Sequence, residues 1–262
     1  MLLDFELLLV AVTLITGLTV LYAWMHRRAR HKAGRPALEK DNWWVDLCRS
    51  LFPVILVVLV IRSFVVEPFR IPSGSMIPTL LAGDFILVNK FSYDVRLPVT
   101  NQSLIPTGEP QRGDLAVFKY PVNPRQDFIK RVVALPGDHV RYDDGLLYIN
   151  GELVEQTDVG DYDEPQAPRA RLMTETLGDR EYGVLQHPRG TWCTDYAASP
   201  DGYTVPDGHY FTIGDNRDRS SDSRCWGPVS EDLLVGRAFL IWMSWNGYEN
   251  RINWSRIGNR IQ

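Results

Sequence analysis

A serine in the stretch IPSGSMIPTL, residues 71–80, is a candidate nucleophile. Ser73 and Ser75 flank a glycine there, and Pro72 and Pro78 enclose the pair. The prolines limit the backbone conformations around Ser75, which helps to hold its hydroxyl in one position. A serine hydroxyl is a weak nucleophile until a neighbouring base takes its proton. Ser75 therefore needs a base from elsewhere in the chain.

The base that the sequence offers is a lysine within an apolar strand. The five histidines are scattered, and none lies in a context that suggests chemistry. In DFIKRVVAL, residues 127–135, Lys130 shares one face of an extended strand with apolar residues. Burial there would lower its pKa from about 10.4 to about 8, which makes a usable general base. Arg131 faces the other way and stays protonated. Taken by itself, such a lysine is more often solvated or bound to a lipid headgroup, and spacing alone does not bring it to Ser75.

A third stretch, GDNRDRSSDSR at 214–224, is dense in short polar side chains and in charges of both signs. It has two interpretations. It is either a solvated loop held by salt bridges, or a polar scaffold that positions a base and shapes a cleft.

Two apolar runs near the N-terminus are candidates to cross a bilayer. Residues 7–24 carry no charge for 18 positions, which is just long enough. A cleaved secretory signal is disfavoured, because Asp4 and Glu6 precede the run and no A-x-A site follows it. The second run, 51–61, is interrupted by Arg62, whose side chain can extend to the interface. The alternative for the second run is a buried core helix.

The charges between these runs predict a topology. Residues 26–49 contain seven Lys or Arg against three Asp or Glu, so the positive-inside rule places this loop in the cytoplasm. The N-terminus and everything from about residue 67 then lie outside. The predicted organisation is a first transmembrane helix at 1–25, a basic cytoplasmic loop at 26–50, a second transmembrane helix at 51–66, and an outer-face domain at 67–262.

The outer-face domain is predicted to be a mostly antiparallel β domain. Short runs rich in Val, Ile and Phe recur at 84–91, 114–120, 128–135 and 209–215. LLYINGELV places Asn150-Gly151 between alternating strands, as a hairpin with a type I′ turn requires.

Two segments of this domain are less clear. Residues 155–205 are rich in acidic residues and proline, with little periodicity, and predict a variable insertion or a smaller β extension. Residues 238–248, AFLIWMSWNGY, are unusually aromatic. They form either a core strand or an apolar surface that enters the bilayer.

Composition excludes several kinds of site. The net charge of −4, with no dominant basic stripe, gives no reason to expect nucleic-acid binding. The three cysteines form no CxxC, which argues against structural zinc. Cys193 and Cys225 would lie on the oxidising side of the membrane, and whether they pair is open.

Four blocks of the sequence, in this order after two spans, closely resemble bacterial type I signal peptidase (leader peptidase). They are PSGSMIPTL, RGDLAVFKYP, DFIKRVVALPGD and GDNRDRSSDSRCWGPV. The matched blocks cover about 67–140 and 209–240. The region 155–205 matches poorly, and the spans match only in placement.

The resemblance implies a membrane-bound serine endopeptidase. It would remove N-terminal signal peptides from exported preproteins at A-x-A-like sites, with a Ser–Lys dyad. The serine of SGSM, here Ser75, is the implied nucleophile, and the lysine of the IKR block, here Lys130, the implied general base. The Ser73 hydroxyl and the backbone N–H of Ser75 would form the oxyanion hole.

The resemblance also implies supporting residues. Ser220 would hydrogen-bond and orient the lysine, and Asp222 with Arg224 would form an ion pair that supports the loop. Asp215 is implied as a structural aid. Phe128 departs from some relatives, which carry tyrosine at this position, so a supporting hydroxyl would be missing here.

The resemblance implies a multi-pass protein of the bacterial cytoplasmic (inner) membrane, with its catalytic domain on the periplasmic face. Its partners would be signal peptides, membrane lipid and, by proximity, the secretion translocon, with no nucleic acid and no metal or organic cofactor.

One alternative function is another Ser–Lys hydrolase. A repressor of that kind would lack the spans, and a penicillin-binding enzyme would show S-x-x-K, where Pro78 stands instead. The other alternative is a non-enzymatic, membrane-anchored β domain that binds exported proteins.

Overall fold

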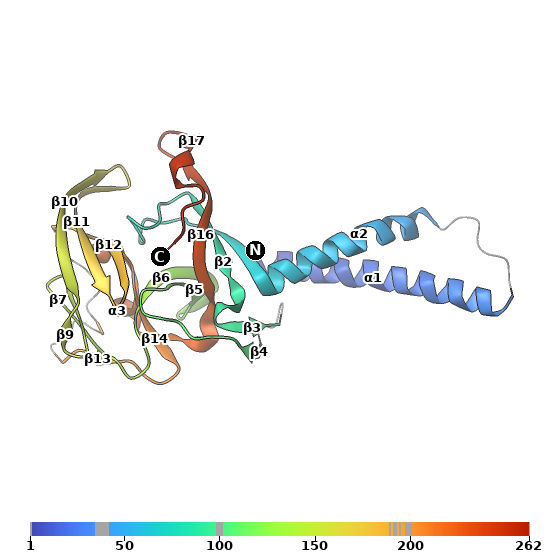
Figure 1. Ribbon diagram of the computed structural model, residues 1–262, viewed down its shortest axis with the longest axis horizontal. Coiled ribbons are helices and arrows are strands. Elements are labelled where there is room, and N and C mark those ends of the chain that lie inside the picture. Colours follow the sequence, from blue (N-terminus) through green and yellow to red (C-terminus); the bar gives the residue numbers. More distant parts are fainter. Residues whose placement is uncertain are drawn as a thin grey trace. The chain divides into compact units, whose positions relative to one another are not determined.

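A computed structural model describes residues 2–34, 42–97, 102–188, 190, 193, 195–196 and 201–261 of the chain (Figure 1). Two compact units can be distinguished by their internal contacts. One comprises Met1–Val66 and Val95–Ile105, and the other comprises Glu67–Asp94 and Pro106–Gln262.

The first unit contains two long apolar helices. Helix α1 spans Leu2–Lys32 and α2 spans Trp43–Val60, followed by a π-helical turn at Ile61–Val65. Both helices are long and apolar enough to cross a membrane, with a mean hydropathy of 2.2 in each. The first unit also contains most of a two-stranded ribbon, in which β3 (Asp94–Arg96) pairs with β4 (Ser103–Pro106).

The helix boundaries differ from the expected ones. The basic residues Arg27 to Lys32 continue α1 and do not begin a loop, because Arg, Lys and Ala favour helix and cations are favourable near a helix C-terminus. Helix α2 begins at Trp43, before the apolar run, where the Asn42 side chain accepts a hydrogen bond from the Trp44 N–H. The expected loop residues 35–41 lie outside the described residues.

The second unit is mostly antiparallel β, as expected. Its largest sheet has eight strands in the order β1-β2-β16-β5-β6-β14-β15, with β17 paired to β16. The bounds are β1 Val66–Arg70, β2 Asp84–Asn89, β5 Leu115–Tyr120, β6 Asn123–Ala134, β14 His209–Ile213, β15 Val229–Ser230, β16 Leu234–Asn246 and β17 Arg251–Ile252.

Two smaller sheets complete the unit. One has the order β13-β7-β8-β9, with β7 His139–Asp143, β8 Leu146–Ile149, β9 Glu152–Leu153 and β13 Tyr203–Thr204. The other is β10-β11-β12, with β10 Glu155–Glu164, β11 Ala167–Leu177 and β12 Arg180–Gln186. The turn between β8 and β9 has φ of 54° at Asn150 and 84° at Gly151, which confirms the expected hairpin.

Residues 155–205, where the sequence allowed an insertion or a smaller β extension, thus carry strands β10 to β13. Strand β10 is exposed along most of its length, so it carries no alternation of apolar and polar residues. This explains why its pattern did not predict a strand.

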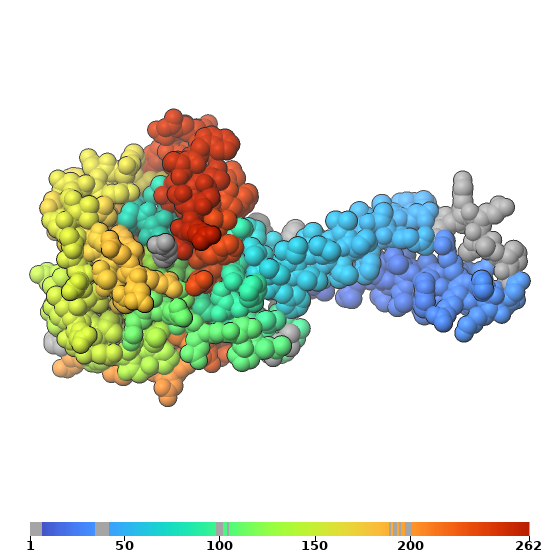
Figure 2. Space-filling model, in the orientation of Figure 1, coloured from blue at the N-terminus to red at the C-terminus, as the bar shows by residue number. Residues whose placement is uncertain are grey.

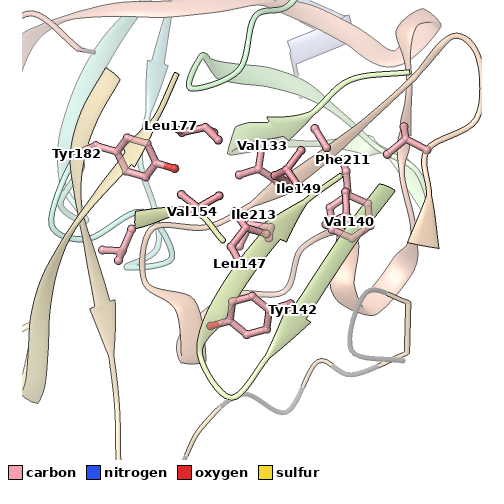
Figure 3. Close-up of a cluster of buried hydrophobic side chains, with 13 residues drawn as sticks. Val133, Val140, Tyr142, Leu147, Ile149, Val154, Leu177, Tyr182, Phe211 and Ile213 are labelled. Carbon is pink, nitrogen blue, oxygen red and sulfur yellow. The ribbon is translucent and has the colours of Figure 1, made fainter. Parts of the chain in front are cut away.

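Four buried clusters lie in the second unit, and two of them are the largest. The larger joins β6, β7, β8, β12 and β14 through residues such as Val133, Val140, Leu147, Tyr182 and Phe211 (Figure 3). A second cluster contains residues from β2, β5 and β16 together with Met76 and Leu80, both fully buried. Burying a side chain of this size contributes about 1.5–3 kcal/mol. The segment that carries Ser75 is therefore anchored by the apolar residues that follow it.

Candidate active site

The two residues expected to carry the chemistry meet in the structure. The Lys130 Nζ lies 2.7 Å from the Ser75 Oγ. Strands β1 and β6 are not neighbours in the sheet, and the segment after β1 brings Ser75 across to Lys130 on β6. The ammonium also donates to the Ile129 carbonyl at 3.0 Å. The distance of 2.7 Å between Ser75 Oγ and Lys130 Nζ is within the range required between a serine nucleophile and its base.

Lys130 is almost completely buried, with 4% of its surface exposed. Burial is the main reason that its pKa falls from 10.5 to about 8. The carboxylates of Asp222 and Asp215 act against this by raising the lysine pKa, while Arg224 lowers it. The Phe128 ring centroid lies 5.4 Å from Nζ, and Phe128 itself stacks on Tyr120. The lysine is thus enclosed by apolar and aromatic groups, as its strand pattern predicted.

A cavity of about 420 Å³ opens beside the pair. Its walls include Ser73, Ser75, Lys130, Phe128 and Asn216. Ser73, which was expected to aid the oxyanion, therefore lines the same cavity as Ser75 and Lys130.

The loop that begins at Gly214 lies against the segment around Ser75, residues 71–83, called the nucleophile segment after the role expected for Ser75. The Asn216 backbone N–H donates to the Ser75 carbonyl at 3.1 Å, and the Asn216 side chain donates to the Gly74 carbonyl at 2.9 Å. A Cβ on Gly214 would lie 2.6 Å from the Ser75 carbonyl oxygen and would overlap Ser220 Oγ. Only glycine allows these segments to approach so closely.

Ser220 is fully buried next to Gly214, but the expected hydrogen bond to Lys130 is not formed. The Ser220 side chain lies instead beside the Asp222 carboxylate, and it helps to lower the pKa of that group. The lysine Nζ is engaged by Ser75 Oγ and by the Ile129 carbonyl instead. The structure thus places Ser220 beside the pair without the expected contact.

Asp222 and Arg224 form the expected ion pair. Both are fully buried, and two hydrogen bonds of 2.8 Å join them. The second carboxylate oxygen of Asp222 also accepts from the Gly214 N–H at 3.0 Å. Arg224 in turn donates to the Arg217 carbonyl at 2.5 Å. The pair therefore fixes both ends of the loop.

Asp215 has a structural partner that the sequence did not identify. Arg131, on the face of β6 opposite Lys130, binds it through two hydrogen bonds of 2.8 Å. Arg131 also donates to the Gly113 carbonyl at 2.7 Å, and Thr79 donates to Asp215 at 2.5 Å. Asp215 thus links β6, the turn before β5 and the segment that carries Ser75.

Three further residues support the site from the β10–β12 sheet, and sequence reasoning missed all of them. Glu175 on β11 forms a buried ion pair with Arg217 and accepts a hydrogen bond from Tyr182 at 2.8 Å. Gln166 lines the active-site cavity, and His187 lies 2.9 Å from the Asn216 side chain. These three residues are isolated polar residues in an acidic stretch without periodicity, so no local pattern marks them. Their roles become visible only in the fold, where they contact residues that are distant in sequence.

The question left open for two of the cysteines is answered. Cys193 and Cys225 form a disulfide, with their Cα atoms 4.7 Å apart. Cys225 lies on the short helix α3 (Ser223–Trp226), directly after Arg224. Among the described residues, no group of three His, Cys, Asp or Glu side chains could hold a metal ion.

The comparisons with known proteins agree on one family. A family model described as "Signal peptidase, peptidase S26" matches residues 44–245. Signal peptidase I of Pseudomonas aeruginosa is 49% identical over 235 residues, which span 84% of this chain and 81% of that protein. Signal peptidase I of Pseudomonas fluorescens is 44% identical over 285 residues, with 98% of each chain covered. A crystal structure of a signal peptidase I from Enterococcus faecalis is 29% identical and covers 49% of this chain and 96% of that chain, with a TM-score of 0.32. The family model and the two Pseudomonas relatives show an enzyme, which excludes the alternative of a non-enzymatic binding domain.

Replacing Lys130 by methionine should stabilise the folded chain at neutral pH. The folded pKa is about 8 against an ordinary 10.5, so below pH 8 the fold holds a charged lysine that burial disfavours. At about 1.4 kcal/mol per pKa unit, the cost is about 3 kcal/mol. It falls as the pH rises through 8 and vanishes above 10.5, where the lysine is neutral in both states. Urea unfolding of the detergent-solubilised chain should therefore show that Lys130→Met raises the free energy of unfolding by a large amount at pH 7 and by a small amount at pH 10.

A matched control is Lys119→Met on the neighbouring strand β5. Lys119 is only partly buried and pairs with Asp127 at 2.7 Å, so its replacement should bring no gain. An equal gain for Lys130→Met at both pH values would attribute the effect to apolar packing and not to titration.

Proposed function

Because this chain belongs to the signal peptidase family, peptidase S26, we propose that it cleaves its substrates with a dyad of Ser75 and Lys130. The family assignment makes it a membrane hydrolase that removes signal peptides from preproteins. The observation that carries the dyad is the 2.7 Å contact between Ser75 Oγ and the Nζ of a buried lysine with a lowered pKa.

In the proposed reaction the neutral Lys130 amine takes the proton of the Ser75 hydroxyl. The serine oxygen attacks the carbonyl carbon of the scissile peptide bond and forms a tetrahedral intermediate. The lysine then gives its proton to the leaving amine, and an acyl-enzyme remains. In the second half, Lys130 takes a proton from water, the hydroxide attacks the ester, and the proton returns to Ser75 as the signal peptide leaves.

The oxyanion of this intermediate needs hydrogen-bond donors. We assign this role to the Ser73 hydroxyl and the Ser75 backbone N–H, because Ser73 lines the same cavity as Ser75 and Lys130. One such donor is worth about 3 kcal/mol in the transition state.

The supporting residues keep the lysine free to act as a base. Asp222 and Asp215 would hold the proton on Lys130, and in our proposal their ion pairs with Arg224 and Arg131 limit this effect. The Ser220 hydroxyl is buried beside Gly214 and close to the Asp222 carboxylate, so it is a polar group next to the dyad, and we assign it a supporting role there.

For substrate choice we propose small residues at −1 and −3 of the signal peptide, as in A-x-A sites. Apolar side chains lie near the dyad: Phe128 lines the cavity, and Ile129 packs against the cluster that contains Met76, the residue after Ser75. Shallow apolar pockets of this kind favour small side chains.

The proposed placement is in the inner membrane, with both helices spanning it and the catalytic unit on the periplasmic face near the translocon. Ser75 follows the end of the second apolar helix, at Val65, by ten residues in the sequence. A signal peptide is cut where it leaves the bilayer, so a nucleophile close to a membrane segment suits the substrate. Lipid contact is proposed for the exposed aromatic side chains Trp242 and Trp254.

The dyad predicts that Ser75→Ala and Lys130→Ala lose cleavage of a purified preprotein by more than about 1,000-fold. Lys130→Arg should be equally inactive although folded, because a guanidinium stays protonated. The wild-type rate should rise with pH and level off above the lysine pKa of about 8, because only the neutral amine accepts the proton. The readout is the mature N-terminus released by detergent-solubilised enzyme.

Lys119→Ala serves as the control and should cleave like the wild type. A rate that stays flat from pH 6 to 9, or full turnover in Lys130→Arg, would remove lysine as the base. If Ser75→Ala alone retains activity, another residue is the nucleophile.

The topology predicts opposite labelling from the two sides of the membrane. In a Cys48→Ser background, Val159→Cys on exposed β10 should react with an impermeant thiol reagent in right-side-out vesicles. Arg28→Cys near the end of α1 should react only in inside-out vesicles. Labelling of both positions from one side would rule out the proposed topology.

Lipid contact predicts that brominated acyl chains quench Trp242 in the reconstituted chain. Trp242→Phe should therefore remove quenched fluorescence. Trp226, packed against Phe118 and Phe128, is the matched control, and Trp226→Phe should remove unquenched fluorescence. Equal quenching of Trp242 and Trp226 would count against a specific contact at Trp242.

A further inference from the structure

A second cavity, of about 300 Å³, adjoins the one beside the dyad. The two cavities share Ser73, Gly74 and Gln166 in their walls. On the side away from Lys130, the second cavity is lined by Arg70, Trp245 and other residues. The nucleophile thus lies in one part of a longer cleft, and nothing in the proposed reaction uses the other part.

Close backbone packing builds one wall of this cavity. The Trp245 N–H donates to the Gly83 carbonyl at 2.9 Å. Gly83 has φ of +103°, and a Cβ there would overlap the Trp245 carbonyl oxygen. The end of β16 can therefore lie directly against the segment that follows Ser75 only because residue 83 is glycine.

Gln166 builds the opposite wall. It lies in the turn between β10 and β11, and its side-chain oxygen accepts from the Ala82 N–H at 2.9 Å. Its side-chain nitrogen donates to the Ala82 carbonyl at 3.2 Å. Both polar atoms of the amide are thus bound to one residue of the nucleophile segment, which holds the hairpin tip at the boundary of the two cavities.

The figures show the same arrangement. The segment around residues 70–83 (teal) lies between the β10–β11 hairpin (yellow) and the end of β16 (red) in Figures 1 and 2. The strands on either side belong to different sheets. The cleft wall is therefore assembled from three parts of the chain that are distant in sequence.

The lining residues favour one class of ligand. Trp245 and Tyr248 provide aromatic surface, and Arg70 provides a guanidinium, whose carbon lies 5.9 Å from the Phe85 ring centroid. Aromatic rings stack on other aromatic rings and attract guanidinium groups. A planar aromatic side chain of the substrate would find both kinds of partner here.

The side chains of an extended substrate alternate in direction, and this alternation decides which of its residues can enter the second cavity. Successive side chains of a strand point to opposite sides, at about 3.3 Å per residue. If −1 and −3 fill the small apolar pockets beside the dyad, then −2 and −4 point the other way. The second cavity begins at Ser73 and Gly74, within two residues of Ser75, which is the right reach for these positions.

We infer that this second cavity is a substrate subsite that accepts an aromatic side chain at −2 or −4 of the signal peptide. The inference rests on the proposed Ser75–Lys130 cleavage at A-x-A sites. It makes Trp245, Tyr248 and Gln166 specificity-determining residues, and it gives the β10–β11 hairpin a part in substrate choice.

The test uses the full-length enzyme in detergent with soluble peptides that contain one A-x-A site. Position −2 or −4 is Ala, Leu or Trp, and the measured quantity is the ratio of kcat/KM for the Trp peptide to that for the Ala peptide. Wild type should show a ratio of about 3 to 10 at one of the two positions, mainly through KM. Trp245→Ala, Tyr248→Ala and Gln166→Ala should bring this ratio close to 1.

The matched control is Trp242→Ala. Trp242 lies on the same strand as Trp245, but its ring packs against Phe85 outside the cavity, so the ratio should stay at the wild-type value. Tyr248 is 67% exposed, so its replacement reports on the subsite even if Trp245→Ala fails to fold.

Several outcomes would overturn the inference. These are a wild-type ratio near 1 at both positions, a ratio that survives both Trp245→Ala and Tyr248→Ala, or the same loss in Trp242→Ala. If the variants change only the binding of phospholipid vesicles and not the ratio, the cavity belongs to a lipid contact. Cleavage of the Ala peptide by wild type and not by Ser75→Ala reports on the dyad separately, so failure of the subsite leaves the dyad intact.

Discussion

The structure depends on keeping one lysine buried beside a serine, with a pKa well below its ordinary value. The pKa of Lys130 lies at about 8 because burial lowers it by more than two nearby carboxylates, Asp222 and Asp215, raise it. Each of these carboxylates is bound by a buried arginine, Arg224 or Arg131. A buried ion pair contributes little net stability by itself. Here both ion pairs affect the pKa of Lys130. Each arginine offsets the negative charge of its carboxylate, which alone would favour the charged ammonium and raise that pKa further.

The backbone around Ser75 must also be held in one position relative to Lys130. Ser75 sits in a segment anchored by the burial of Met76 and Leu80, and held by Asn216 through hydrogen bonds to the Ser75 and Gly74 carbonyls. Gly214 allows this contact by having no side chain. The distance of 2.7 Å between Ser75 Oγ and Lys130 Nζ therefore reflects several contacts that come from different parts of the chain.

The β10–β12 sheet has a closer relation to the site than its composition suggested. Glu175 binds Arg217 in the loop that follows β14, and Gln166 binds Ala82 in the nucleophile segment. Replacing a buried partner such as Glu175 would leave Arg217 buried without its carboxylate, which typically costs several kcal/mol. The sheet is thus part of the support of the site and not only an addition to it.

The sequence alone determined what depends on local pattern: the two apolar helices, the mostly antiparallel β unit, the Asn150-Gly151 hairpin and the burial of Lys130 on an apolar strand face. These follow from hydrophobic period and turn chemistry, which neighbouring residues carry. Only the tertiary structure decided the meeting of Ser75 with Lys130, the pairing of Asp215 with Arg131, the Cys193–Cys225 disulfide and the roles of Glu175 and Gln166. The hydrogen bond expected between Ser220 and Lys130 is not formed, and the lysine Nζ binds Ser75 Oγ and the Ile129 carbonyl. Each of these contacts joins residues whose relative positions are set by the packing of separate sheets and loops, and local pattern contains no information about that distance.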